Sequence, residues 1–155
     1  MKTLLLLSLA LLSCSASVEA QDLKEARAFV TKVYSQYDSC LTPNSDNCGS
    51  NLDPGWFSKS LWHLIDLDRK AAEKAGGNPY LDADPICACQ DPEGLRVVRL
   101  QLSPRGNNRA IAFVTLNSAV GVVRLSLVFT KAGWRIDDIA EDDMPSLRKF
   151  LRTKQ

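Results

Sequence analysis

The chain has 155 residues, of which 45% are hydrophobic and 24% are charged, proportions typical of one soluble domain with its own core. Its 19 basic and 18 acidic side chains give a formal net charge of +1. Because nucleic-acid binders show a basic excess or a basic stripe, this balance argues against a polyanionic partner.

Residues 1–20 are expected to be a signal peptide that takes no part in the fold. A short positive region, Met1-Lys2, is followed by an apolar run from Thr3 to Leu12. Val18-Glu19-Ala20 then offers the small residues after which a signal peptidase cuts. The apolar run is about ten residues long, well short of the ~20 that span a bilayer.

A second interpretation of the leader is lipidation of Cys14, because Leu11-Leu12-Ser13-Cys14 resembles a bacterial lipobox. Cleavage after Ala20 predicts a periplasmic or secreted protein, whereas lipidation predicts a membrane-anchored lipoprotein. Both interpretations place a single domain, residues 21–155, outside the cytoplasm.

Four cysteines remain once Cys14 is removed or lipidated: Cys40, Cys48, Cys87 and Cys89. An oxidising compartment predicts two disulfides, for which three pairings exist. A bond between Cys87 and Cys89 would close a very small ring, since bonded cysteines prefer a Cα separation of ~5.5–6 Å. Cross-links between the Cys40–Cys48 loop and the Cys87–Cys89 segment are therefore favoured. The cysteine spacing lacks the paired pattern of a zinc site, so neither a metal nor another cofactor is predicted.

The first half of the domain is predicted to be helical. Residues 22–38 form an amphipathic helix, with Asp22 and Glu25 resembling a capping box. Residues 42–55 are a loop rich in Pro, Gly, Asn and Asp. Residues 57–75 form a second amphipathic helix that ends at Gly76-Gly77. Residues 80–91 are an irregular connector, because Pro85 and several aspartates disfavour a helix.

The second half changes to the two-residue period of strands. Strands are predicted over residues 95–102, 110–116, 122–130 and 134–139. In the first, Val98, Leu100 and Leu102 are expected on one face. A short helix follows Met144-Pro145-Ser146. These elements predict an α+β domain in which two N-terminal helices pack on a curved antiparallel sheet of about four strands.

This order of elements resembles the nuclear-transport-factor-two-like (cystatin-like) fold, a curved sheet wrapped around a long first helix. Short motifs are also similar to those of an exported bacterial family within that superfamily: Asp84-Pro85 with Gln90-Asp91, Gly133-Trp134-Arg135-Ile136-Asp137-Asp138-Ile139, and Leu147-Arg148-Lys149-Phe150-Leu151. The resemblance covers most of residues 22–152. It implies a cone between sheet and helices, in which many proteins of this fold bind ligands or partners and some hold a catalytic Asp and His.

His63 is the only histidine and lies on the predicted second helix. A catalytic pair needs a carboxylate within hydrogen-bond reach. Asp66 is three residues away, where helix geometry alone explains its proximity. We therefore expect His63 at the surface or boundary rather than acting as a general base.

Two acidic clusters are candidate contact sites. Asp84, Gln90 and Asp91 could recognise a partner or ligand, but side chains of these types beside prolines usually satisfy backbone groups, and the structural role is favoured. Similarly, Asp138 of the pair Asp137-Asp138 is expected to bond backbone at the end of its strand, unless the pair contacts a basic partner.

The sequence has no Gly-x-Ser-x-Gly motif of serine hydrolases and no Gly-x-Gly-x-x-Gly or Walker pattern for binding phosphates. Nothing singles out a pair of catalytic carboxylates. The first hypothesis is a non-catalytic exported protein that binds a protein partner in the cell envelope. Its most specific form is an inhibitor or immunity protein against a toxin or cell-wall hydrolase, an inference from analogy. The second is a small-molecule carrier or enzyme with a pocket lined by His63, a carboxylate and Trp134 or Trp62. A third is an envelope assembly factor tethered through Cys14.

Overall fold

The computed structural model describes residues 15–41, 52–106, 108–117 and 121–154, with side chains from residue 23 onward. The helical elements are α1 (Ser15–Tyr34), the 3-10 helices η1 (Ser35–Leu41) and η2 (Pro54–Trp56), α2 (Lys59–Ala75) and α3 (Leu147–Arg152). The strands are β1 (Val97–Pro104), β2 (Arg109–Leu116), β3 (Val122–Thr130) and β4 (Gly133–Ala140).

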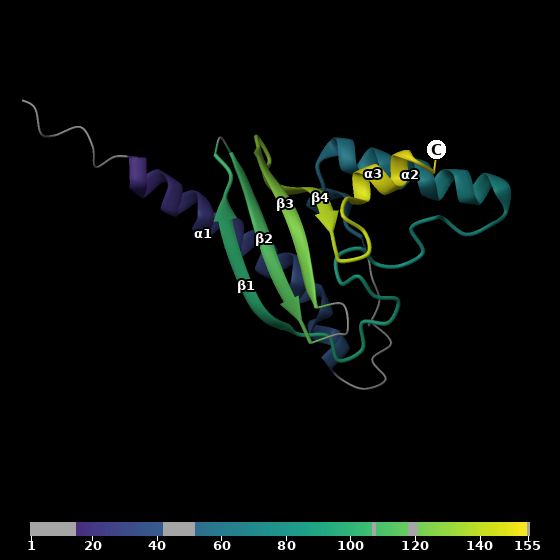
Figure 1. The fold of residues 1–155 in the computed structure, drawn as a ribbon, viewed down its shortest axis with the longest axis horizontal. Helices are drawn as coiled ribbons and strands as arrows, with labels where there is room; N and C mark the ends of the chain where they lie inside the picture. The colour runs from purple at the N-terminus through teal and green to yellow at the C-terminus, as the bar shows by residue number, and fades with distance from the viewer. Residues whose placement is uncertain (1–14, 42–51, 107, 118–120, 155) are drawn as a thin grey trace, which may run out of the picture.

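The four strands form one antiparallel sheet in the order β1-β2-β3-β4. Helix α1 crosses one face of this sheet, while α2 and α3 lie side by side next to β4 (Figure 1). The predicted α+β class, with two N-terminal helices, a four-stranded antiparallel sheet and a short C-terminal helix, is confirmed.

Helix α1 starts earlier and ends earlier than its sequence pattern predicts. It begins at Ser15 rather than at Asp22, so the cleavage expected after Ala20 falls within the helix. The alternation of apolar residues continues past Tyr34, but the backbone tightens there into η1. The spacing of apolar residues does not distinguish the α-helix from the 3-10 helix, because η1 also buries residues three apart, Tyr37 and Cys40.

Helix α2 ends at Ala75, as Gly76-Gly77 predicts, but begins at Lys59, two residues later than predicted. The hydroxyl of Ser58 accepts a hydrogen bond from the amide of Leu61 at 3.2 Å, which caps the first turn. Gly76 ends the helix in the left-handed conformation, with φ of 64°. None of the helices in the described part of the chain combines the length and hydropathy needed to cross a bilayer.

Strand β1 contains an irregularity that the period-two pattern does not reveal. Its pairing with β2 shifts register between Val97 and Arg99, as at a β-bulge, which places two residues opposite one. Val98 is consequently 66% exposed, and the expectation that it shares a buried face with Leu100 and Leu102 is wrong. Val97 instead faces the same space as Leu100.

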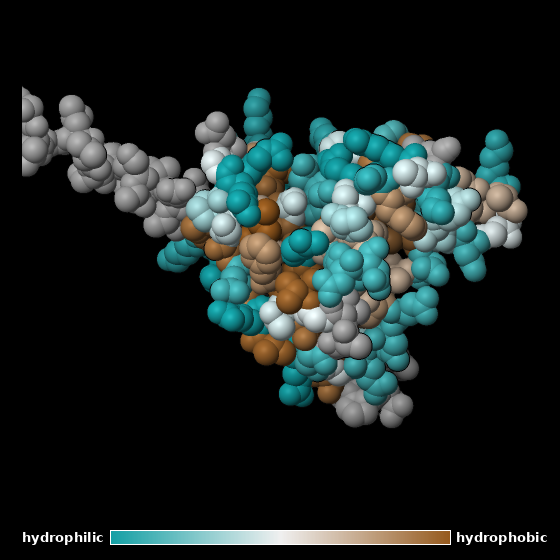
Figure 2. Space-filling view, viewed as in Figure 1, coloured by the Kyte–Doolittle hydropathy of each residue, from teal (hydrophilic) through white to brown (hydrophobic). Residues whose placement is uncertain are grey.

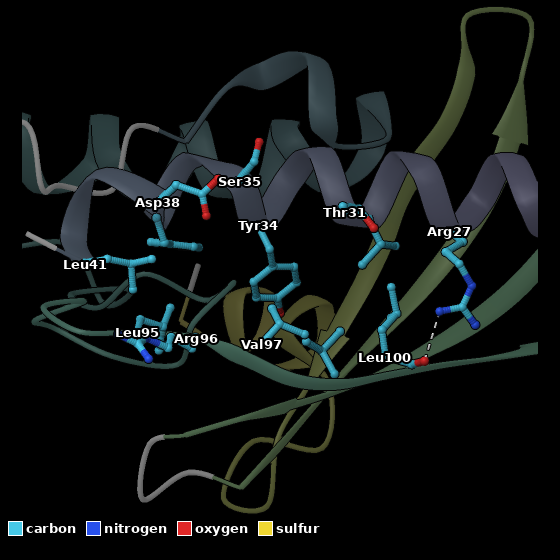
Figure 3. A pocket seen from close by; sticks show the side chains of 13 residues that line it. Arg27, Thr31, Tyr34, Ser35, Asp38, Leu41, Leu95, Arg96, Val97 and Leu100 are labelled. Carbon is cyan, nitrogen blue, oxygen red and sulfur yellow. Dashed lines mark hydrogen bonds between the residues drawn. The ribbon is translucent and has the colours of Figure 1, made fainter.

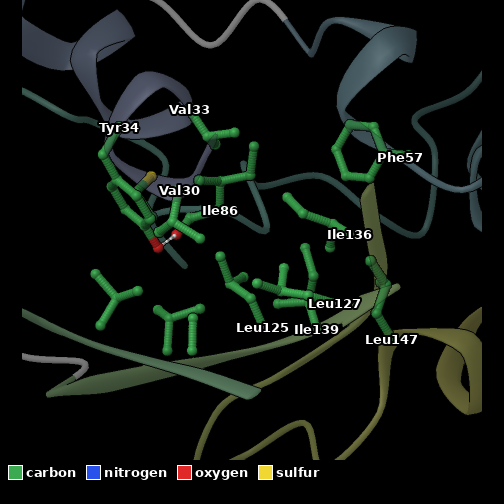
Figure 4. Close-up of a cluster of buried hydrophobic side chains, with 14 of the residues drawn as sticks. Val30, Val33, Tyr34, Phe57, Ile86, Leu125, Leu127, Ile136, Ile139 and Leu147 are labelled. Carbon is green, nitrogen blue, oxygen red and sulfur yellow. Dashed lines mark hydrogen bonds between the residues drawn. The ribbon is translucent and has the colours of Figure 1, made fainter. Parts of the chain in front are cut away.

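A single hydrophobic core fills the space between α1 and the sheet (Figure 4). Val30 and Val33 of α1 meet Leu125 and Leu127 of β3, and Leu147 of α3 closes the end beside β4. Each of these side chains is almost fully removed from water, which supplies the main favourable term of folding.

Among the described residues, no helix covers the opposite face of the sheet. Alternate residues of β2 and β3 on that face, including Ile111, Phe113 and Val128, are only partly buried. In the space-filling view, apolar areas there are interspersed with polar side chains (Figure 2).

Candidate functional site

A groove of about 460 Å³ opens between the α1–η1 helix and strand β1 (Figure 3). Thr31 and Tyr34 point from the helix toward the strand, and Val97 and Leu100 face them from below. We call this space the α1–β1 groove. Its described lining comprises Arg27, Val30, Thr31, Tyr34, Ser35, Tyr37, Asp38, Leu41, Leu95, Arg96, Val97, Leu100 and Val114.

Two tyrosines of the groove wall are fixed by the connector that follows α2. The Tyr34 hydroxyl donates to the carbonyl of Ile86 at 2.7 Å, and the Tyr37 hydroxyl donates to the carboxylate of Asp84. Burial raises the pKa of both hydroxyls, and the nearby charge of Asp84 adds to the effect. Both tyrosines therefore stay neutral hydrogen-bond donors, and their rings form a pre-positioned wall.

Asp84 has the structural role that its position beside Pro85 predicts. It is only 6% exposed, and its carboxylate also accepts the Ile86 amide at 2.8 Å. Burial raises the pKa of this carboxyl above its ordinary value, although the hydrogen bonds from Tyr37 and from the amides of Ile86 and Cys87 act in the opposite direction. Its backbone forms a two-way bridge with Cys89, so Asp84 organises the connector.

Cys87 and Cys89 are bonded to each other, with a Cα separation of 5.1 Å. The cross-links expected between the Cys87–Cys89 segment and the Cys40–Cys48 loop are therefore wrong. The small ring forms because the intervening Ala88 adopts the left-handed conformation, with φ of 51°. Residues other than glycine rarely adopt this conformation. The bond closes a turn within the connector instead of joining two distant segments.

Cys40 is also disulfide-bonded and buried. Since Cys87 and Cys89 are bonded to each other, its partner lies outside the described residues. Cys48 and Cys14, the expected disulfide cysteine of the loop and the candidate lipidation site, both lie outside the described residues.

The ends of the α1–β1 groove carry charged side chains. At one end, Arg27 Nη1 donates to the carbonyl of Leu100 at 3.1 Å. At the other end, Arg96 lies below Asp38 (Figure 3). All three side chains are exposed, so the groove has an apolar middle and polar ends.

A smaller pocket of about 350 Å³ brings together three of the residues considered from sequence, Asp84, Gln90 and Trp62. It lies between α2 and the connector and is also lined by Arg69. Asp91 is not part of the described lining; its carboxylate accepts the amide of Glu93 at 2.9 Å, as in an Asx-turn. The contacts of Asp84 and Asp91 agree with the structural role predicted for these two residues, whereas Gln90 lines the pocket.

The second acidic cluster ties the C-terminal helix to the sheet. One oxygen of Asp138 accepts hydrogen bonds from the backbone amides of Ile139 at 2.9 Å and Arg148 at 3.0 Å. Its second oxygen accepts a hydrogen bond from the Ser146 hydroxyl at 2.7 Å. The prediction that Asp138 bonds backbone at the end of its strand is confirmed.

Asp137 pairs with Arg148 at 2.6 Å and, at the longer distance of 3.5 Å, with Arg109. Partial burial raises the pKa of Asp137, but the hydrogen bond from Ser58 and the pairing with Arg148 outweigh it and hold that pKa below its ordinary value. Arg148 thereby links β4, α2 and α3.

Trp134 and His63 lie in different environments, one buried and the other exposed. Trp134 is 5% exposed and meets Phe129 edge-on at 5.4 Å between ring centroids, so it belongs to the core. His63 is exposed on α2, as expected, and the neighbouring Asp66 pairs with Arg69 and Lys70, each at 2.7 Å. Neither Trp134 nor His63 is among the described lining residues of the two cavities.

Sequence reasoning missed the residues that make the α1–β1 groove. The sequence pattern places Arg27 on the solvent-facing side of an amphipathic helix and Arg96 within the strand predicted over residues 95–102, and neither residue belongs to a motif. The groove depends on the bulge that turns Val97 inward and on the tyrosine contacts to the connector. A strand pattern with two adjacent valines is the only local signal, and it does not locate a bulge.

The histidine, cysteine and acidic side chains of the described residues do not gather into groups of three that could hold a metal ion. No family model, curated protein or solved structure matches the chain. The resemblance to the nuclear-transport-factor-two-like superfamily thus stays a prediction from the element order and the short motifs.

Proposed function

We propose that this protein is an exported, non-catalytic binding protein and that the α1–β1 groove is its binding site. The observation that carries the proposal is the groove itself, an open space of about 460 Å³ with an apolar middle and charged ends. Ligand sites are commonly concave, mostly apolar and of ~300–1,000 Å³, with a few polar groups that orient the ligand. The leader at residues 1–20 supports export.

The rigidity of the wall supports binding. Tyr34 and Tyr37 are held by hydrogen bonds to the connector, and Val30 and Val114 are fully buried behind them. A pre-formed wall loses little conformational freedom on binding, which leaves more of the contact energy for affinity.

The chemistry of the lining supports a function without turnover. The tyrosine hydroxyls are already engaged by the connector. Asp38, a carboxylate of the described lining, is exposed at the rim. Burial or a neighbouring group usually adjusts the pKa of a general base to its task. The described lining residues place no such group against the apolar middle of the groove.

The first form of this function is binding of a protein segment in the cell envelope, in the most specific case as an inhibitor or immunity protein of a toxin or cell-wall hydrolase. Val97 and Val98 favour it, because they expose apolar surface on β1, an edge strand of the sheet, and edge strands readily contact extended segments. The second form is binding of a small ligand in the groove, which its volume favours.

The experiment that tests the binding site is photocrosslinking of the exported protein in cells. A photoreactive residue replaces Thr31, which lines the groove, and the matched control carries it at Lys32, the next exposed residue of α1, which is absent from the described lining. We expect one defined protein or small molecule to be captured at position 31 and not at position 32, with its identity read by mass spectrometry.

Equal labelling at the two positions, or none at either, would contradict the proposed site. If a protein is captured, its purified form is titrated with the wild type and with Thr31→Trp, which fills the groove. Inhibition of the partner's own activity by the wild type, and its loss in Thr31→Trp, is the outcome expected of an inhibitor or immunity protein.

A further inference from the structure

We propose that the ligand of the α1–β1 groove is a linear amphipathic carboxylate, held with its carboxylate at Arg27 and its apolar chain over Tyr34. This inference rests on the proposed binding function and specifies the chemistry of the occupant. Three properties of the groove carry it: an apolar middle, an elongated shape and an uneven distribution of charge between the two ends.

The middle of the groove is built to cover an apolar chain. Val30, Tyr34 and Val114 are buried along its floor and wall. Val97 and Leu41 line the groove while remaining 41% and 39% exposed, so apolar surface is left in water unless something covers it. At ~30 Å³ per water-sized group, the space accommodates roughly fifteen such groups.

The groove is elongated. Its helical wall runs from Arg27 to Asp38, and at a rise of ~1.5–2 Å per residue it is on the order of 17 Å long. Figure 3 shows the strand side following the same line, from Leu100 near Arg27 to Arg96 near Asp38. This shape suits an extended chain better than a compact ring system.

The Arg27 end is the cationic end. The bond from Nη1 to the Leu100 carbonyl fixes the guanidinium at the strand edge and uses one of its five N–H donors. Lys24 lies one turn earlier on the same flank of α1 and is exposed. The opposite end carries one charge of each sign, from Arg96 and Asp38, which both line the groove.

A carboxylate is the anion that this end matches best. The planar guanidinium fork binds a carboxylate through two parallel N–H···O bonds, and the charge of one arginine is balanced by one carboxylate. Placing the head at Arg27 directs the chain along Thr31 and Tyr34 toward Leu41, which is the apolar line of the groove.

The inference is tested by isothermal titration of the mature, disulfide-bonded protein with decanoate and with decanol, which has the same chain without the charge. We expect decanoate to bind at least tenfold more tightly than decanol, since a charge-assisted hydrogen bond contributes about 1.5–3 kcal/mol. Thr31→Trp should abolish the binding of both probes, and Lys32→Trp should leave both unchanged.

Arg27 is tested with three matched variants. Arg27→Gln should weaken decanoate binding roughly tenfold and leave decanol binding unchanged. Arg27→Lys keeps the charge but loses the paired N–H···O bonds, so it should restore only part of the affinity for decanoate. Arg99→Gln removes an exposed arginine of β1 that is absent from the described lining, and we expect no effect. Thermal melts of each variant establish that it is folded.

The outcomes separate this inference from the proposed function. Equal affinity for decanoate and decanol, insensitivity to Arg27→Gln, binding that survives Thr31→Trp, or no binding of decanoate would each overturn the carboxylate assignment. Specific crosslinking of another species at position 31 would then leave the binding function standing. Absence of both probe binding and crosslinking would overturn both.

Discussion

Asp84 is the residue at which the connector, helix η1 and the small disulfide ring meet. Its side chain accepts hydrogen bonds from Tyr37 and Ile86, and its backbone pairs with Cys89. A buried carboxyl with these partners is a structural residue whose protonation affects folding, since a difference in pKa between the folded and unfolded states makes stability depend on pH.

We predict that acidification stabilises the wild type relative to Asp84→Asn. Because burial raises the pKa of Asp84 in the folded state above the unfolded value of 3.8, its contribution to stability is fully present below pH 3.8 and is lost as pH rises through the folded pKa. Each pKa unit corresponds to about 1.4 kcal/mol.

Urea denaturation at pH 7, 5 and 4 measures this difference, with Asp82→Asn as the control because Asp82 is an exposed residue of the same connector. A difference between wild type and Asp84→Asn that stays constant with pH would contradict the role assigned to burial.

Arg148 is a second residue that connects several elements, so its replacement should lower the stability of the fold. Its guanidinium binds Asp137 at 2.6 Å and the hydroxyls of Ser58 and Ser60 at 3.1 and 2.6 Å. We predict that Arg148→Ala lowers the free energy of unfolding by about 2 kcal/mol, since hydrogen bonds to a charged group are lost. Arg109→Ala removes the longer ion pair to Asp137, in which the Arg109 side chain is 58% exposed. It should lower the free energy of unfolding by less than about 1 kcal/mol.

Chemical denaturation at pH 7 compares the two arginine variants. Since the pKa of Asp137 is held below its ordinary value in the fold, the stability that this group contributes is present above the unfolded pKa and is lost as pH falls through the folded one. The cost of Arg148→Ala should therefore shrink in acid. Equal costs for the two substitutions would refute the link through Arg148.

At the scale of elements, the connector between α2 and β1 is the part that shapes the groove. It carries the Ile86 carbonyl and the Asp84 carboxylate to which Tyr34 and Tyr37 bond. The Cys87–Cys89 bond holds this turn closed. The connector has no regular secondary structure, so its conformation depends on these few contacts.

We predict that replacing both cysteines, as Cys87→Ala/Cys89→Ala, lowers the free energy of unfolding by about 1.5 kcal/mol. A ring of only a few residues restricts the unfolded chain less than the long loops that give ~3–5 kcal/mol. Urea denaturation of the oxidised wild type and the double variant measures this change. A loss well above 3 kcal/mol would show that the bond does more than close a local turn.

For the molecule as a whole, the sheet, α1 and the C-terminal helix share one core. The predicted signal peptide overlaps the start of α1, so the site at which it is cleaved would set where the mature helix begins. The first described side chain in contact with the core is Leu23, which follows the cleavage site expected after Ala20.

We predict that the exported protein begins at Gln21, and the intact mass of the natively exported chain measures this directly. Substitution of Cys14 by Ser should leave that mass unchanged, because the cysteine is removed with the leader. A mature chain that begins at Cys14 and carries lipid would instead establish membrane anchoring, and the Cys14→Ser variant would then lose the lipid.

The fold class follows from patterns that act locally. The two-residue period of β3 and β4 and the Gly76 signal at the end of α2 depend only on a few neighbouring residues. Element type and the end of α2 are therefore predictable. The structural role of Asp138 is predictable for the same reason, since backbone groups at a strand end need partners.

The groove and the cysteine pairing are decided only in the tertiary structure. Val97 turns inward because a bulge next to Val98 changes the register of β1, and Tyr34 and Tyr37 form a wall because the distant connector accepts their hydroxyl hydrogens. Cys87 bonds to Cys89 because Ala88 adopts a left-handed conformation that its side chain disfavours. The sequence by itself determined which segments form helices and strands, since periodicity and capping are local. The arrangement of Arg27, Tyr34 and Val97 around one space depends on contacts between distant segments, which local patterns do not encode.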